Sequence, residues 1–202
     1  MPLGLTPVAL SLLLASYSPR RRELLGQAGF EFESISPRVA EKFDVDLTLR
    51  ELTLWNAIHK GMSVARTRPE KVVLAADTLV ALDDEIIGKP NDLKDAARVL
   101  GQLSNRAHDV CSAVFVCHLA GGRSTSFHEI SRVRFRRLRK ANIDNYLAKV
   151  NPMDKAGAYA AQGCGAEIID KIEGSYTNVV GLPMEQTIRV LRQFGIRPRA
   201  RC

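Results

Sequence analysis

LSLLLASYSPRRRELL, residues 10–25, passes abruptly from an apolar run into a polar and basic one. The pattern predicts a buried strand at 10–15 followed by a helix at 19–28. Pro19 suits the first helical position, where its missing N–H costs nothing, and Ser18 before it is a usual N-cap residue. The segment therefore predicts a strand that leads through a hydroxyl-bearing loop into a helix N-terminus.

Three consecutive arginines, Arg20 to Arg22, occupy the first turn of this predicted helix. Cations there oppose the helix dipole, so the run is a poor choice for stability alone. A bound polyphosphate would resolve the conflict, because helix N–H groups and guanidinium groups both bind its oxygens. The alternative is an exposed face with a chance run of charge. We favour the anion site.

Composition indicates an ordinary globular chain, and its net charge favours anionic partners. The 202 residues are 46% hydrophobic and 25% charged, which suits one domain. The net charge of +7 favours anionic ligands, although basic proteins without such ligands are common. Within the basic run 132–140, Val133 and Phe135 alternate with arginines, which is typical of an exposed sheet face. We therefore expect no specific nucleic-acid partner.

Two features predict a cytoplasmic protein with no membrane partner. The apolar run from Val8 to Ala15 resembles the centre of a signal peptide, but no Lys or Arg precedes it and it is too short to span a bilayer. The four cysteines form no CxxC pair and show no zinc-ligand spacing with a histidine, which fits a reducing compartment.

The order of apolar patterns predicts a mixed α/β fold rather than strict βαβ repetition. We predict strands at 10–15, 72–76, 79–82, 110–118, 127–135 and near 166–172. We predict helices at 19–28, 48–65, 92–103, 141–149 and 184–194. Residues 83–85 and Gly121-Gly122 are expected to form turns between strands, and the basic tail 197–202 is expected to fray.

Two further stretches place charged groups after apolar runs. Asp77 and Thr78 follow the strand predicted at 72–76, and ligands bind at the carboxyl ends of strands in α/β sheets. Asp77 could orient a metal or accept a proton from water, and the alternative is an Asx turn or a cap. Lys89 follows Gly88 and offers a compact cation for a phosphate oxygen. The P-loop pattern GxxxxGK[ST] is absent, as is a Ser/His/Asp nucleophile elbow.

Residues 153–163, MDKAGAYAAQG, are rich in small side chains that let the backbone approach a ligand closely. Gln162 carries both a donor and an acceptor, which suits the edge of a nucleobase. The alternative is tight internal packing with the polar side chains outside.

Taken together and in order, LASYSPRRRELL, AADT, GKPND, MDKAGAYAAQG and GSYTNVVGLP resemble the Maf family of nucleotide pyrophosphatases. The resemblance runs from about residue 12 to residue 196. It implies a Maf/ITPase-like fold, an elongated mixed sheet flanked by helices, with two lobes around a central cleft. It also implies a single domain over 1–202, with a core of about 10–196 and a basic tail at 197–202.

The resemblance further implies hydrolysis of a nucleoside triphosphate between its α- and β-phosphates, with a divalent metal cation, Mg²⁺ or Mn²⁺. Asp77 matches the family's proposed proton acceptor, and Glu41 with Asp77 is the implied metal pair. Arg20, Thr78 and Gln162 match positions of the dTTP/UTP-cleaving branch, whereas the 7-methyl-GTP branch typically has Trp, Gln and Glu there. The other implied substrate-binding residues are Ser16, Arg21, Lys60 and Lys89.

The chain also departs from the family pattern. Ala40 stands where a second acid often precedes the glutamate, and Ala160 replaces a usual glycine. Two other functions stay open: a module that binds nucleotide or nucleic acid without hydrolysis, and a house-cleaning pyrophosphatase that prefers purine nucleotides or 7-methyl-GTP. Family members are often dimers, so the resemblance also allows a homodimer.

Overall fold

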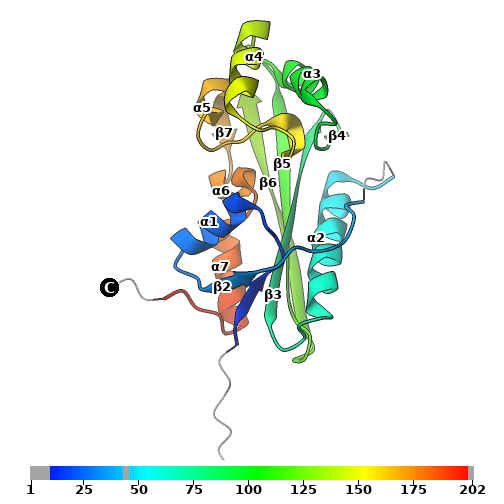
Figure 1. Ribbon diagram of the computed structural model, residues 1–202, viewed down its shortest axis with the longest axis vertical. Helices are drawn as coiled ribbons and strands as arrows, with labels where there is room; N and C mark the ends of the chain where they lie inside the picture. Colours follow the sequence, from blue (N-terminus) through cyan, green and yellow to red (C-terminus); the bar gives the residue numbers. More distant parts are fainter. Residues whose placement is uncertain (1–9, 43–45, 200–202) are drawn as a thin grey trace, which may run out of the picture.

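A mixed β-sheet runs the length of the molecule, and helices cover both of its faces (Figure 1). The structure, a computed structural model, describes residues 10–42 and 46–199. Its strands are β1 (Leu12–Leu14), β2 (Phe32–Ser34), β3 (Val72–Leu82), β4 (Glu85–Ile87), β5 (Ala107–His118), β6 (Arg123–Phe135) and β7 (Ile169–Glu173). They lie in the order β2-β1-β3-β5-β6-β7, with β4 paired to β3. β1 is parallel to β2 and β3, and the other pairs are antiparallel, so the predicted mixed α/β class is confirmed.

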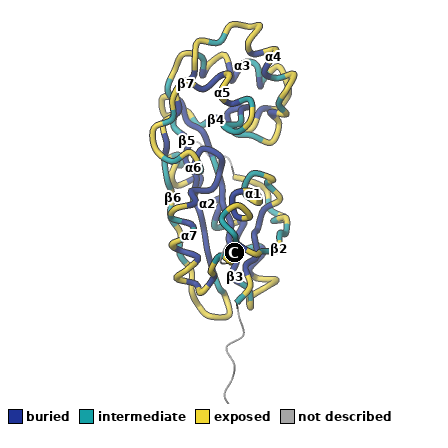
Figure 2. Tube along the Cα trace, turned by 90° about the vertical axis from the view of Figure 1, so that its left-hand side faces the viewer, coloured by how far each residue is buried: buried dark blue, intermediate teal, exposed yellow. Residues whose placement is uncertain are grey.

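The helices gather into two lobes along the long strands β3, β5 and β6 (Figures 1 and 2). They are α1 (Pro19–Gln27), α2 (Leu49–Ala65), α3 (Leu93–Leu103), α4 (Lys140–Lys149), the 3₁₀ turn η1 (Ala156–Ala158), α5 (Gly165–Ile168), α6 (Tyr176–Val180) and α7 (Met184–Gln193). In the lower lobe α1, α6 and α7 share one apolar core, and α2 forms a second core on the opposite face of the sheet. In the upper lobe α3, α4 and α5 pack into a third core.

Side chains of β3 alternate between these cores, as the pleat of a strand requires. Leu74 and Ala76 pack into the core shared with α1 and α7, whereas Val73 and Ala75 pack into the core beneath α2. The same alternation directs Asp77 towards α2 and Thr78 towards α1 and α6. The side chains of these two adjacent polar residues therefore lie on opposite faces of the sheet.

β3 has a gap in its pairing at this point. On one side, β1 ends with Leu14 opposite Leu74, and β4 pairs only from Val80, opposite Ile87. Within the described ranges, no strand pairs with residues 75–79 of β3 on that side. On the other side β5 pairs with β3 without interruption. The gap separates the lobes and leaves the middle of β3 accessible from one edge.

The two strands predicted at 72–76 and 79–82 are one strand, which corrects the expectation that Asp77 follows a strand end. The polar pair stays in the strand because each side chain has a polar partner, Lys60 for Asp77 and Ser112 for Thr78. The strand that ends beside Asp77 is its parallel neighbour β1. The carboxyl end of a strand therefore does lie near Asp77, but that strand is β1 and not β3.

The other expectations largely hold. All five predicted helices exist with bounds within two residues, and Asp83 and Asp84 form the hairpin turn with positive φ angles. The short elements β2 and α6 were missed, because periodicity cannot be recognised over so few positions. The strand predicted near 166–172 begins only at Ile169, because residues 165–168 form the short helix α5.

The chain ends differ in part from expectation. The expected fray of the tail is wrong for its first residues, because the Arg199 amide donates to the Gly29 carbonyl. Residues 200–202 of that tail, like Val8 and Ala9 of the apolar run, lie outside the described residues. In the part of the chain that the structure describes, no helix is long and apolar enough to cross a membrane.

Candidate active site

A cavity of about 560 Å³ opens at the pairing gap of β3. Its size lies in the range of small-molecule sites, roughly 300–1,000 Å³. The lining comes from the β1–α1 loop, the loop before α2, α2 itself, β3, the segment after β4, residues 154–161 and the end of α6. Eight of the nine predicted site residues line it: Ser16, Arg20, Arg21, Glu41, Lys60, Asp77, Thr78 and Lys89.

The N-terminus of α1 borders this cavity, as the sequence predicts. Ser18 is the N-cap residue, but its side chain caps nothing, which corrects the expectation of a capping hydroxyl. The buried Ser16 Oγ instead accepts the Ser18 N–H at 3.1 Å. No acidic residue lies in the first turn of the helix, so its positive end is left for an anion.

Arg21 is held in one orientation at the edge of the cavity. Its Nε donates to the Gly181 carbonyl at 2.8 Å and its Nη2 to Thr78 Oγ1 at 3.1 Å. A longer contact of 3.5 Å joins Nη1 to Ser16. Burial lowers the pKa of Arg21 below its usual value, and the Asp77 carboxylate opposes that shift. The guanidinium is therefore ordered before any ligand arrives.

A buried network of hydrogen bonds fixes Thr78 from below. Its Oγ1 lies 2.8 Å from Ser112 Oγ, which donates to the Asn178 carbonyl at 2.9 Å. The Asn178 side chain accepts the Ser112 N–H and donates to the Val110 carbonyl and Ser131 Oγ. Sequence reasoning missed Asn178, although it falls in the GSYTNVVGLP stretch. A polar residue amid apolar neighbours was the available signal.

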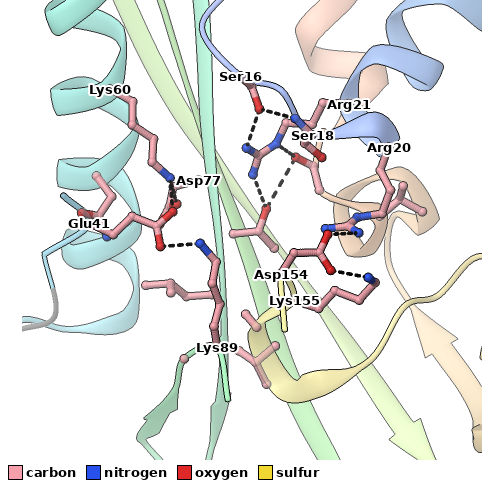
Figure 3. A pocket seen from close by; sticks show the side chains of 18 of the residues that line it. Ser16, Ser18, Arg20, Arg21, Glu41, Lys60, Asp77, Lys89, Asp154 and Lys155 are labelled. Atoms are coloured by element: carbon pink, nitrogen blue, oxygen red, sulfur yellow. Dashed lines mark hydrogen bonds and ion pairs between the residues drawn. The ribbon is translucent and has the colours of Figure 1, made fainter. Parts of the chain in front are cut away.

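On the α2 side, Lys60 joins the two carboxylates predicted to bind metal. Its Nζ lies 2.5 Å from Asp77 Oδ1 and 2.7 Å from Glu41 Oε1 (Figure 3). Lys89 donates to the other oxygen of Glu41 at 2.7 Å. Burial of Glu41 opposes its ionisation, but Lys60 and Lys89 outweigh this effect and lower its pKa to about 2. Glu41 is therefore a carboxylate at neutral pH.

The residues present fit a divalent cation of the Mg²⁺ type. Asp77 lines the cavity, and its Oδ2 is buried without a hydrogen-bond partner among the described residues, so one carboxylate oxygen is left unpaired. Mg²⁺ is usually bound by one or two carboxylates together with substrate phosphates. Glu41 and Asp77 could supply these two, although Lys60 shares both. Across the described ranges, no cluster of three or more His, Cys, Asp or Glu forms a metal cage of protein groups alone.

Comparison with known proteins identifies the family. The model of the Maf family, "Maf-like protein", matches residues 11–194 of the chain. The chain belongs to the Maf family. A dTTP/UTP pyrophosphatase of Bacillus pumilus is 43% identical over 187 residues, which cover 93% of this chain and 98% of that protein. A dTTP/UTP pyrophosphatase of Aquifex aeolicus is 42% identical, over 92% of this chain and 96% of that protein.

Solved structures give a weaker likeness. The Ham1 protein of Staphylococcus aureus is 16% identical, with a TM-score of 0.41. The match covers 62% of this chain and 71% of the Ham1 chain. A score this low carries no argument about the site.

In this Maf chain, a second charged wall of the cavity was missed by sequence reasoning. Arg20 Nη1 donates to Asp154 Oδ2 at 3.1 Å, and Lys155 Nζ donates to Asp154 Oδ1 at 2.5 Å (Figure 3). Asp154 and Lys155 stood in the MDKAGAYAAQG stretch, but nothing local distinguished them from surface charges. Only the fold brings them opposite Arg20.

Gln162 is the one predicted site residue that does not line the cavity of this Maf domain. Its Nε2 donates to Glu23 at 3.3 Å, while Ala160 and Ala161 before it do line the cavity. The Tyr146 hydroxyl accepts the Ala160 N–H at 3.0 Å and anchors this turn to α4. Gln162 therefore contacts α1 from outside the set of residues that line the cavity.

Proposed function

We propose that this protein hydrolyses dTTP and UTP to the nucleoside monophosphate and pyrophosphate. Relatives that are more than 40% identical over nine-tenths of the chain are named dTTP/UTP pyrophosphatase. One observation carries the proposal: a buried carboxylate, Asp77, lies in a cavity where cations from distant segments converge. A buried carboxylate with one unpartnered oxygen is of little use for binding a polyphosphate directly, but it suits the activation of water.

The charge of the cavity suits a triphosphate. Of the described residues that line it, six are cationic and three are carboxylates. Guanidinium groups bind phosphate oxygens through two parallel hydrogen bonds, and lysines act as point charges. Arg20 and Arg21 extend from the α1 end, and Lys60 and Lys89 from the opposite side. A polyphosphate between them would also meet the free N–H groups of α1.

Asp77 would act as the proton acceptor. Lys60 occupies Oδ1 and orients the carboxylate, which leaves the unpartnered Oδ2 to accept a proton from the attacking water. If the water oxygen bonds to the α-phosphorus, the bridging P–O bond between the α- and β-phosphates breaks and pyrophosphate is the leaving group. If it bonds to the β-phosphorus, the same bridge breaks and the nucleoside monophosphate is the leaving group. One carboxylate base contributes about 10²–10⁴-fold, and positioning and electrostatics supply most of the rest.

A divalent cation at Glu41 and Asp77 would supply charge neutralisation on the phosphates. We propose Mg²⁺ or Mn²⁺ as this cation, because the resemblance to the Maf family implies one of the two. We likewise propose that Arg20, Thr78 and Gln162 set the preference for pyrimidine bases. Gln162 would reach a base only if the ligand extends past Ala161, or if Gln162 gives up its hydrogen bond to Glu23 and bonds to the base instead.

A substrate panel tests the proposal. Pyrophosphate release would be measured from dTTP, UTP, ITP, XTP and 7-methyl-GTP, each with and without Mg²⁺. We expect the highest kcat/KM for dTTP and UTP, and dependence on the cation. Binding without turnover would identify the non-catalytic module instead, and preference for ITP or 7-methyl-GTP would identify the other branch. We place the activity in the cytoplasm, and sedimentation would determine whether a homodimer forms.

A further inference from the structure

Asp154 lies between two cations and contacts each through a different oxygen. Oδ1 accepts from Lys155 Nζ at 2.5 Å and Oδ2 accepts from Arg20 Nη1 at 3.1 Å. Arg20 belongs to α1 in the lower lobe, whereas residues 154 and 155 precede η1 in the upper lobe. The Arg20–Asp154 pair therefore crosses the cavity from one lobe to the other (Figure 3).

Lys155 gives Asp154 a fixed support. Its ammonium also donates to the Asn151 carbonyl at 2.6 Å, its backbone N–H donates to the Pro152 carbonyl, and its side chain is only 12% exposed. Lys155 also balances the charge of Asp154, so the carboxylate adds little net repulsion towards a polyphosphate. The pKa of Asp154 lies below its usual range because Lys155 and Arg20 outweigh the effect of burial.

Arg20 uses only part of its guanidinium in this pair. Within the described residues, Nη1 contacts Asp154, and neither Nε nor Nη2 has a partner. A guanidinium presents five donors in a planar fork, so a contact at one nitrogen also restrains the directions of the others. Arg20 can therefore keep Asp154 and still offer its remaining donors to a phosphate.

We propose that Asp154 is a positioning residue for the substrate, which acts through Arg20 by holding its free donors towards the triphosphate. This inference rests on the proposed function. It assigns Asp154 a part in binding rather than in the chemical step, since no atom of Asp154 needs to touch the reacting phosphorus. Without Asp154, the Arg20 side chain can adopt more rotamers in the free protein. Binding then has to order it, which costs free energy and weakens binding.

The test compares Asp154→Ala with the wild type in steady-state hydrolysis of dTTP and in calorimetric binding of α,β-methylene-dTTP, a non-hydrolysable analogue. We expect KM and the dissociation constant to rise about threefold to tenfold, with kcat within about twofold, the size expected for one side chain that loses its order. Asp154→Asn, which can still accept from Arg20, should recover part of the loss. Glu185→Ala, which breaks the exposed Glu185–Arg189 pair on α7, is the matched control and should change neither constant.

A double-mutant cycle separates action through Arg20 from a direct effect. In an Arg20→Ala background, Asp154→Ala should have no further effect on binding. Additive effects, an unchanged dissociation constant or tighter binding in Asp154→Ala would overturn the proposal. The binding assay tests Asp154 independently of turnover, so a wild type that binds the analogue but releases no pyrophosphate would contradict the proposed function alone.

Discussion

The Lys60 ammonium lies 2.5 Å from Oδ1 of Asp77, with both side chains almost wholly buried. The contact joins α2 to the middle of β3 at the level where β3 lacks a neighbouring strand on one side. An ionised carboxylate without such a partner would be costly at this depth. Lys60 therefore stabilises the charge that the proposed chemistry needs.

Lys60→Met should destabilise the fold strongly. Removing one partner leaves the Asp77 carboxylate buried and uncompensated, which costs about 3–5 kcal/mol. Urea unfolding monitored by circular dichroism would measure the change. Lys171→Met is the control, because its pair with Glu173 is exposed on both sides and such pairs contribute about 0–1 kcal/mol. Equal losses in the two variants would contradict a special role for the buried pair.

Glu41 should stay ionised in mild acid. Lys60 and Lys89 outweigh burial and lower its pKa to about 2, against 4.5 in an unfolded chain. Because the folded pKa is the lower one, the contribution of Glu41 to stability is complete above pH 4.5. It is lost as the pH falls from there towards 2. A carboxyl NMR titration would measure this pKa, and a midpoint near 4.5 would show that the two lysines do not hold Glu41 in solution.

His108 should make stability depend on pH in a different window. The ring is 2% exposed, its Nε2 lies 2.8 Å from the Tyr159 hydroxyl, and burial with the nearby Arg132 lowers its pKa to about 4. The unfolded chain binds the proton at about 6.5, so stability is complete above that value. It falls by about 3 kcal/mol as the pH drops from 6.5 to 4.

Urea midpoints at pH 7.5 and 5 would test this dependence. His108→Gln keeps a polar partner for Tyr159 but cannot ionise, so its midpoint should change less between the two conditions than that of the wild type. The same slope in both proteins would assign the effect to other groups.

Two glycine substitutions in helices should have opposite effects. A Cβ on Gly61 of α2 would overlap Cδ1 of Phe115 and lie 3.2 Å from Cβ of Ala75, so Gly61→Ala should cost about 1–3 kcal/mol. Gly101 in α3 has nothing within 4 Å of the added atom. Gly101→Ala should therefore stabilise the fold by about 0.5–1 kcal/mol. Thermal unfolding measures both, and a gain in Gly61→Ala would mean that α2 can move away from the sheet.

Much of the fold was predictable because its long elements carry clear periods. The helix at 49–65 has a full capping box at Thr48 and Glu51, and β5 and β6 are long and regular. The continuity of β3 through Asp77 was not predictable, since local sequence shows two polar residues and not their partners. Lys60 and Ser112 become visible only when α2 and β5 are in place.

The site divides in the same way. Ser16, Arg20 and Arg21 share one short loop and helix turn, so a local signal reveals them together. The place of Asp154 in the site depends on its contact with Arg20, 134 positions away, which the local sequence around Asp154 does not indicate. Gln162 differs again, because its chemistry suits a base edge while its side chain contacts Glu23.

The most direct test of the central claim compares Asp77→Asn with the wild type on dTTP. The products would be identified by ³¹P NMR, and binding of α,β-methylene-dTTP would be measured in parallel. We predict that the wild type forms dTMP and pyrophosphate, and that Asp77→Asn loses about 10²–10⁴-fold in kcat but still binds the analogue. Turnover by Asp77→Asn at the wild-type rate, or release of inorganic phosphate and dTDP by the wild type, would contradict the account.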